Sequence, residues 1–354
     1  MTRLISKIRI AVTPLAAVAL FLAVVALFTS NAQAATPGIT GTSFSLVASP
    51  NYVTQPDGMS LYSWGYGCAS TYKPTYAPAA FASIGFCPTM QIPGPTLIVT
   101  EGQTVTVTLT DNLPGNTNAS IVFPGFQVTA SGGTPGLLTN EATPGGSVTY
   151  TFVASAPGTR AYYSGTQTDF QVQMGMYGAL VVLPAHVPTN CTPLGSDVFQ
   201  EEGVGNPGGD FRLAPAAYDH PETCYDREYL FQFMEMDSRI NMEAEAEAKA
   251  IANCVPANQL GGVPCPTTFN VPTEPFRPNY FVINGRSMPD DMDADYAPNY
   301  PNQPYNGNPH MHPGDLVLLR TIGQGRWQHP FHQHGNHVRI LSRDGNLILS
   351  HCQL

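Results

Sequence analysis

The chain has 354 residues, of which 43% are hydrophobic and only 11% are charged, against a usual charged share of about 25%. Enough apolar surface is present for a packed core, the length allows two domains, and 33 Gly with 33 Pro favour a turn-rich, mostly β protein. The net charge of −10 argues against non-specific binding to nucleic acid or anionic lipid, which needs a basic surface.

Residues 1–34 have the features of a secretory signal peptide. Three basic residues precede an apolar run over residues 10–28, and Ala32-Gln33-Ala34 is a small-x-small cleavage signal. A retained membrane anchor is the alternative interpretation. No later stretch reaches the roughly 18 apolar residues that a membrane-spanning helix needs. We therefore expect a mature protein that is secreted or periplasmic and has no membrane partner once the signal is cleaved.

Short strands separated by Pro-Gly turns are predicted between residues 40 and 186. Thr104–Thr110 and Ser147–Val153 alternate apolar and polar residues with a period of two, as half-buried strands do. Ala179–Leu183 is continuously apolar, which is typical of a strand buried on both faces. Strands at this spacing predict a β-sandwich or barrel, and no helical periodicity is evident in this part.

The pattern changes between residues 188 and 266. Arg239–Asn253 is rich in strong helix formers and contains a favourable Glu245/Lys249 pair at i,i+4 spacing. We interpret this part as a connector that carries one surface helix.

Strands return from Phe269 onward. The candidates are Tyr280–Ile283, Asp315–Arg320, His337–Leu341 and Asn346–Leu349. A sandwich of the immunoglobulin type needs about seven strands, so the second domain is expected to be incomplete.

Cysteine usage agrees with export. All seven cysteines follow residue 34, and six of them form neighbouring pairs along the chain. Six cysteines allow 15 pairings, and neighbouring positions favour the disulfides Cys68–Cys87, Cys191–Cys224 and Cys254–Cys265. Cys352 is left over, which suggests a free thiol, an intermolecular bond, or a chain that stops before its natural end.

Histidine placement carries most of the chemical information. His329, His332 and His334 lie within six residues. On an extended strand, residues two apart point to the same side, so His332 and His334 would present two imidazoles together. Neutral imidazole suits copper or zinc. We predict that these three histidines are metal ligands; a polar histidine cluster on a sheet face is the alternative.

Other metal-binding patterns are weaker. His310-Met311-His312 could bind Cu(I) through imidazole and thioether groups, but a loop before a strand is the simpler interpretation. Four aspartates between residues 290 and 295 could cup Ca²⁺, but they lack the glycine and terminal glutamate of an EF-hand. A solvated acidic turn is the favoured interpretation of that segment.

The segment His329-Pro330-Phe331-His332-Gln333-His334-Gly335 resembles the His-Pro-x-His-Leu-His-Gly motif of multicopper oxidases, laccase-like proteins built from cupredoxin domains. Residues 92–105, 157–159, 174–182, 283–285 and 311–317 also resemble parts of that family, and the match covers about residues 90–185 and 280–342. The resemblance implies an all-β fold of two cupredoxin-like Greek-key β-sandwich domains, at residues 35–187 and 267–354, joined by the connector 188–266.

The resemblance also implies a chemistry. In that family a type 1 copper takes electrons from substrate, and four His-x-His pairs hold three coppers that reduce dioxygen to water. By resemblance His329 would face the type 1 copper, and His332 and His334 would face the oxygen-reducing coppers.

This sequence departs from the family pattern at the remaining ligand positions. The family's first pair aligns with Val122 and Pro124, and its second pair aligns with Tyr163 and Gly165. The His-Cys-His element should lie tens of residues beyond His334, outside the chain. The ligand count therefore excludes a complete trinuclear cluster in this chain, which is either truncated or belongs to a branch whose first domain has become structural.

Two main functional hypotheses follow from the resemblance. One is an exported copper-dependent oxidoreductase that oxidises a small-molecule electron donor by single electrons. The other is a non-catalytic copper-binding or electron-transfer module. A structural or adhesion domain with relict histidines is a third interpretation, and oligomerisation is left open. Copper is the expected cofactor.

Overall fold

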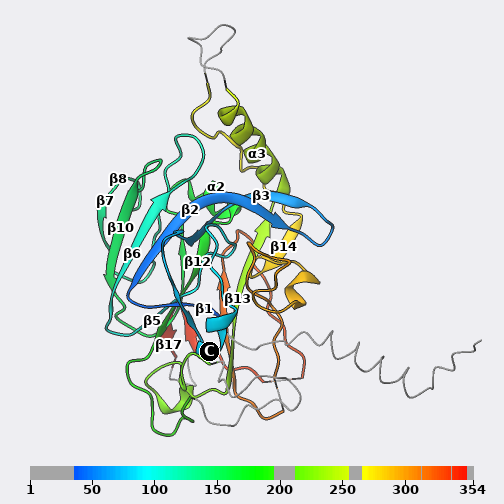
Figure 1. Cartoon of the computed structure of the whole chain (residues 1–354). Helices are drawn as coiled ribbons and strands as arrows, with labels where there is room; N and C mark the ends of the chain where they lie inside the picture. The colour runs from blue at the N-terminus through cyan, green and yellow to red at the C-terminus, as the bar shows by residue number, and fades with distance from the viewer. Residues whose placement is uncertain (1–35, 195–211, 255–264, 312, 336, 349–354) are drawn as a thin grey trace, which may run out of the picture. The chain divides into compact units, whose positions relative to one another are not determined.

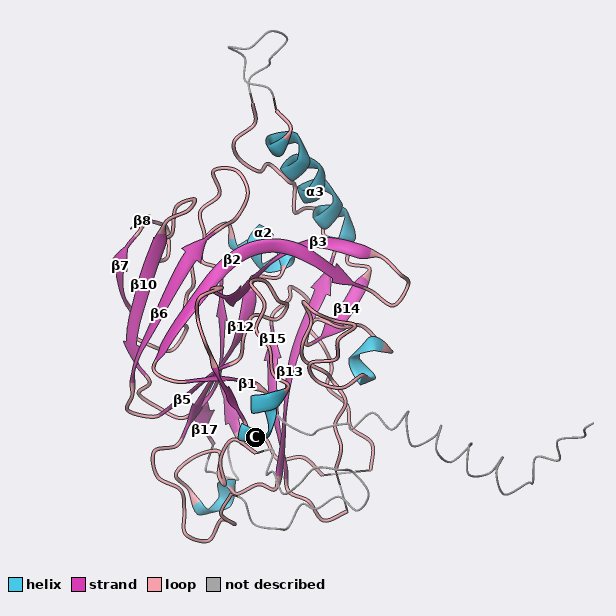
Figure 2. Ribbon diagram, viewed as in Figure 1, coloured by secondary structure: helices cyan, strands magenta, loops and turns pink. Residues whose placement is uncertain are grey.

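The computed structural model describes residues 36–194, 212–254, 265–311, 313–335 and 337–348 (Figures 1 and 2). The predicted signal segment 1–34 and Cys352 lie outside the described residues. The described part is an all-β sandwich fold with two α-helices, which confirms the predicted fold class.

Two five-stranded sheets form the first sandwich. One has the strand order β11-β12-β5-β1-β4 and the other β3-β2-β6-β10-β7. The strands of the first sheet are β1 (Gly38–Thr40), β4 (Thr75–Ala77), β5 (Leu97–Thr100), β11 (Gly158–Tyr163) and β12 (Tyr177–Leu183). Those of the second are β2 (Ser43–Thr54), β3 (Ser60–Cys68), β6 (Thr104–Asp111), β7 (Thr129–Gly132) and β10 (Ser147–Val153). A small hairpin of β8 (Thr134–Pro135) and β9 (Asn140–Glu141) lies beside them.

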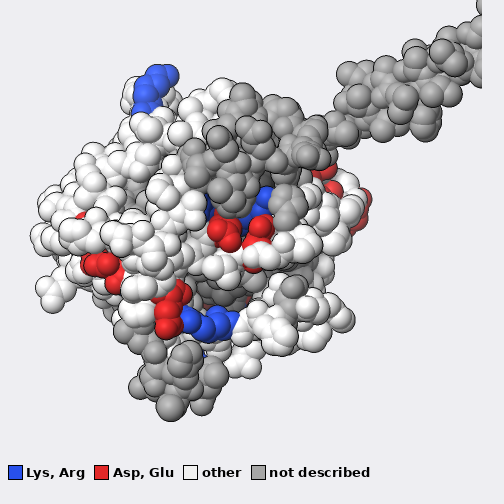
Figure 3. Space-filling model, turned by 90° about the horizontal axis from the view of Figure 1, so that it is seen from below, with Lys and Arg blue, Asp and Glu red and all other residues white. Residues whose placement is uncertain are grey.

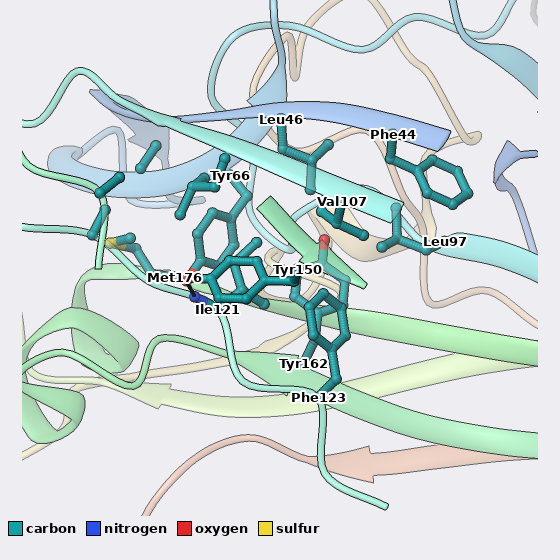
Figure 4. Close-up of a cluster of buried hydrophobic side chains, with 14 of the residues drawn as sticks. Phe44, Leu46, Tyr66, Leu97, Val107, Ile121, Phe123, Tyr150, Tyr162 and Met176 are labelled. Carbon is teal, nitrogen blue, oxygen red and sulfur yellow. Dashed lines mark hydrogen bonds between the residues drawn. The ribbon is translucent and has the colours of Figure 1, made fainter. Parts of the chain in front are cut away.

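The alternating pattern of β6 and β10 explains how this sandwich closes. Val105, Val107 and Leu109 are fully buried, while the threonines between them are more accessible, and β10 alternates in the same way. On the outer face Thr108 and Thr149 join their hydroxyls across the pair at 3.0 Å. The buried faces of both sheets meet in an aromatic-rich core (Figure 4).

The continuously apolar strand β12 is buried on both faces, as predicted. Leu180 and Val182 point into the sandwich core. On the opposite face Ala179 packs against Leu230 and Ile322, which belong to a third sheet. This double contact is the physical reason for the unbroken apolar run.

The third sheet has the order β14-β13-β15 and consists of β13 (Arg227–Met236), β14 (Tyr280–Ile283) and β15 (Val317–Gly323). Its central strand β13 lies in the segment interpreted from sequence as connector. The strand was missed because its charged residues suggest exposure, whereas Glu228 and Glu235 are buried with hydrogen-bonding partners.

The predicted helix is present as α3 (Ser238–Ala252). Asp237 caps its first turn by accepting a hydrogen bond from the backbone N–H of Arg239, and Ile240 and Ala244 pack into the first core. The expected pair forms, with Lys249 Nζ 2.5 Å from Glu245 Oε1.

The expectation of no helix before residue 186 is wrong, because α2 spans Thr168–Met174. Its seven residues form too few turns to show a periodic stripe. It also buries two glutamines, Gln171 and Gln173, beside the apolar side chains of Phe170 and Met174. Gln171 is held by the hydroxyl of Ser164 and by its own bond to the carbonyl of Asn118.

The prediction of strands at His337–Leu341 and Asn346–Leu349 is also wrong in the residues that it includes. Residues 337–341 are not in a strand, and the described part of this segment forms only a hairpin of β16 (Ser342–Arg343) and β17 (Asn346–Leu347). Val338 is 67% exposed. A strand needs a neighbour for its backbone hydrogen bonds, and a local apolar pattern cannot supply one.

The three predicted disulfides, Cys68–Cys87, Cys191–Cys224 and Cys254–Cys265, are confirmed. Among the described helices, none combines the length and hydropathy that crossing a membrane would require. One face of the molecule is largely uncharged, with acidic and basic groups close together rather than gathered by sign (Figure 3).

Candidate metal centre

The predicted histidine ligands lie in the segment that follows β15. This segment is a loop rather than the expected strand. Pro330 lacks a backbone donor and Gly335 has a φ of +74°, and both features disfavour a continuous strand. His332 and His334 are nevertheless adjacent in space, with ring centroids 4.7 Å apart at an interplanar angle of 90°. Both side chains belong to exposed residues.

His329 points to a different environment. Its Nε2 forms a hydrogen bond with the carboxylate of Glu235, and its ring stacks on Phe233 at 5.8 Å. The structure therefore places His332 and His334 together at the surface, whereas the ring of His329 contacts Glu235 and Phe233 of strand β13.

Glu235 is the residue of this site that sequence reasoning missed. Its side chain is 0% exposed. One carboxylate oxygen, Oε2, accepts hydrogen bonds from the backbone N–H groups of Arg326 at 2.9 Å and Trp327 at 3.3 Å. Only the pairing of β13 with β15 brings this residue to the loop, since Phe233 is in register with Gly323, the last residue of β15.

A pocket of about 470 Å³ opens beside His329. Its walls include the aromatic rings of Phe233, Trp327 and Phe331. Trp327 and Phe331 are each about half exposed. An apolar cleft with one convergent polar ring is the usual form of a small-molecule site.

The carboxylate of Glu235 also acts on a neighbouring phenol. Burial raises the pKa of Tyr177 well above its ordinary value, and the nearby Glu235 charge raises it further. Tyr177 therefore stays protonated at physiological pH. Its hydroxyl is buried and forms no hydrogen bond within the described part of the chain.

The fit of copper to these residues follows from donor chemistry. Imidazole nitrogen is a good ligand for copper. The edge-to-face rings of His332 and His334, with their centroids 4.7 Å apart, place two such donor groups next to each other. Within the described residues, no group of three or more His, Cys, Asp or Glu side chains is arranged to hold a metal ion.

The positions of the first domain that align with the family's histidine pairs meet in space, and none of them carries an imidazole. The backbone N–H of Val122 donates to the carbonyl of Tyr163 at 2.9 Å. A Cβ added to Gly165 would lie 2.8 Å from Val122 Cγ1 and 3.2 Å from Ser120 Oγ. Side-chain packing therefore leaves no room for a larger residue at position 165.

The two weaker metal-binding candidates are the His310-Met311-His312 segment and the aspartate-rich turn at residues 290–295. His312 lies outside the described residues. The aspartate-rich turn winds around the buried side chain of Arg286, which donates to the backbone carbonyls of Asp293 and Ala294. Burial raises the pKa of Asp295 to about 7. A guanidinium already supplies the positive charge in this turn.

Comparison with known proteins finds similarity over part of the chain. A sequence model of the multicopper oxidase family matches residues 86–186. The chain is 37% identical over 95 residues to the multicopper oxidase MCE of Talaromyces pinophilus, a match covering 27% of this chain and 15% of that protein. It is 34% identical over 115 residues to laccase 1 of Metarhizium acridum (strain CQMa 102), covering 32% and 18%.

This part of the chain is similar in sequence to multicopper oxidases. The crystal structure of the blue copper oxidase from Nitrosomonas europaea shares the fold with a TM-score of 0.50 at 18% identity, over 86% of this chain and 68% of that one. The matched segments span less than a fifth of the two curated relatives. The family-model match, over residues 86–186, includes none of the three predicted histidine ligands.

Proposed function

We propose that this chain is an exported copper-binding protein in which His332 and His334 hold a copper ion and His329 supplies a further imidazole. The edge-to-face approach of the His332 and His334 rings, 4.7 Å apart, carries the proposal. Imidazole donors and the multicopper oxidase-like sequence both favour copper. Bound copper supplies a one-electron acceptor.

The chain is proposed to act as a copper-binding or electron-transfer module rather than as a complete oxidase. His186 is the only histidine in the sequence of the proposed first domain, so this domain offers no His-x-His pair to a trinuclear cluster. The packing around Gly165 supports the idea that this sandwich has become structural. We propose the domain division 35–187, 188–266 and 267–354, with β13 of the connector completing the sheet beneath the histidines.

The aromatic pocket beside His329 favours the second candidate, an oxidoreductase. A small-molecule electron donor would fit between Trp327 and Phe331, with His329 as the polar group that orients it. Oxygen uptake distinguishes this candidate from simple copper storage. Only an oxidoreductase would consume the electron donor and dioxygen in a fixed ratio.

Copper analysis of the purified protein tests the proposal. Replacing His332 by alanine removes one ring of the pair, so the His332→Ala variant should bind less copper than the parent. His186→Ala, which truncates an exposed histidine outside the site, is the matched control and should retain the parent content. Unchanged copper in His332→Ala would contradict the assignment. A blue absorption band with about four coppers per chain would instead indicate a complete oxidase.

A further inference from the structure

A further cavity, of about 580 Å³, opens beside the start of helix α2, and none of the three predicted histidine ligands lines it. Its walls come from four separate segments of the chain: residues 116–118, the β8–β9 hairpin, residues 165–169 and residues 268–269. The volume lies within the usual range of small-molecule sites, about 300–1,000 Å³. The cavity is therefore large enough for a small organic ligand.

The carboxylate of Glu141 organises one wall of this cavity. Its Oε1 accepts a hydrogen bond from the hydroxyl of Thr166 at 2.8 Å, and its Oε2 accepts one from the side-chain amide of Asn118 at 2.9 Å. Thr166 is 9% exposed, and its hydroxyl also bonds to that of Ser120 at 2.8 Å. Side chains that are already fixed lose less conformational entropy when a ligand binds. This wall is thus preorganised.

The β8–β9 hairpin supplies an apolar rim. It passes close to Glu141 because residue 136 is glycine, where a Cβ would lie 2.5 Å from Glu141 Cδ. The next two residues, Leu137 and Leu138, line the cavity and are 92% and 60% exposed. The rim therefore offers apolar contact to a ligand whose other groups meet mostly polar walls.

Several polar side chains of the cavity have unused hydrogen-bonding capacity. The amides of Asn116 and Gln167 and the hydroxyls of Thr117 and Thr268 form no side-chain hydrogen bond within the described part of the chain. An amide carries donors and an acceptor, and a hydroxyl can do both. The cavity therefore offers a ligand donors as well as acceptors.

The charge of the lining argues against an anionic ligand. Glu141 and Asp169 are acidic, and none of the described residues that line the cavity is Lys, Arg or His. An anion would meet two carboxylates without a compensating cation. An ammonium group has donors only, so it would leave the amide donors of Asn116 and Gln167 unused. A neutral ligand with several hydroxyl groups suits both kinds of side chain.

We propose that this cavity binds a neutral carbohydrate. The hydroxyl groups around a pyranose ring donate and accept hydrogen bonds, which matches the amides of Asn116 and Gln167 and the carboxylate of Glu141. The C–H groups of the ring form an apolar face that lies against Leu137 and Leu138. The site requires no copper, so it is independent of the proposed copper-binding function.

Titration of the full chain with sugars tests the ligand class, followed by saturation-transfer NMR and calorimetry at pH 6. The neutral probes are D-glucose, D-galactose, D-mannose and cellobiose. Each hexose has a cationic counterpart, its amino sugar, and an anionic counterpart, its uronate. We expect saturable binding of at least one neutral sugar, and binding of the corresponding uronate that is weaker by at least about tenfold.

Two results of this titration would overturn the proposal. One is the absence of saturable binding for all four neutral probes. The other is binding of the amino sugars alone, which would indicate a site for organic cations.

Two variants locate the bound sugar. Asn116→Ala removes an exposed side chain that has no hydrogen bond in the described structure, so the fold should persist. Loss of one hydrogen bond to the sugar should weaken binding by about 2–12-fold. The matched control is Asn112→Ala, because Asn112 is also exposed and does not line the cavity.

Leu137→Ala removes half of the apolar rim and should also weaken sugar binding. Its matched control is Leu316→Ala, because Leu316 is 60% exposed and lies outside the cavity. Unchanged affinity in both Asn116→Ala and Leu137→Ala would refute the placement of the sugar in this cavity. Losses in the two controls as large as those in their partners would refute it as well.

Discussion

The buried ion pair between Arg320 and Glu228 allows a quantitative test of how the third sheet is attached to the sandwich. Arg320 Nε lies 2.8 Å from Glu228 Oε2, and the two side chains are 4% and 0% exposed. Arg320 also donates to the hydroxyl of Thr159 on β11 at 2.9 Å. Burial lowers the pKa of Arg320, but the charges of Glu228 and Tyr225 and their hydrogen bonds together more than offset this, so the pKa is raised.

Replacing Arg320 by methionine keeps most of the side-chain volume but leaves Glu228 as a buried charge without its cation. Breaking a buried pair in this way typically costs about 3–5 kcal/mol. Glu228 keeps two donors, the backbone N–H of Leu213 and the hydroxyl of Tyr225, so we expect the lower part of that range.

Equilibrium unfolding in guanidinium chloride, followed by tryptophan fluorescence, measures this loss. Trp64 is fully buried in the first core and reports its unfolding. The matched control is Arg339→Met, because Arg339 lies 2.9 Å from Glu222 but both side chains are about half exposed. Exposed pairs contribute about 0–1 kcal/mol. Equal losses in the two variants would refute the argument that burial decides the cost, and the double variant Arg320→Met with Glu228→Gln should recover part of the stability.

Two further predictions concern single positions. Gly325→Ala should lower the free energy of unfolding by about 1–3 kcal/mol through overpacking against Glu235, whereas Gly323→Ala should not; similar thermal unfolding of both would contradict the steric argument. Burial raises the pKa of Asp111 to about 7 despite its hydrogen bond from the backbone N–H of Leu113, so the folded state holds a proton that the unfolded state releases near pH 4. Its contribution to stability is therefore full below about pH 4 and is lost as pH rises toward 7. Asp111→Asn should remove this part of the decline, and equal pH slopes for parent and variant between pH 4 and 7 would argue against it.

The sequence by itself determined much of the framework. The period-two strands β6 and β10, the doubly buried strand β12, the helix α3 and all three disulfides were predicted from local patterns. These features depend on neighbouring residues, because alternation, helix propensity and cysteine spacing are properties of short segments. The pairing of His332 and His334 was predicted from their spacing, although the expected strand is a loop.

Only the tertiary structure decided which groups meet around the histidines. The charged residues in the sequence of β13 suggest that the strand is exposed to solvent. Parallel pairing with β15 instead buries Glu235 and brings its carboxylate to His329. Likewise, Arg320 and Glu228 are separated by 92 positions and become partners only when two strands align. Polar groups are buried where long-range partners satisfy them, and the identity of a long-range partner is not contained in any local pattern of a single sequence.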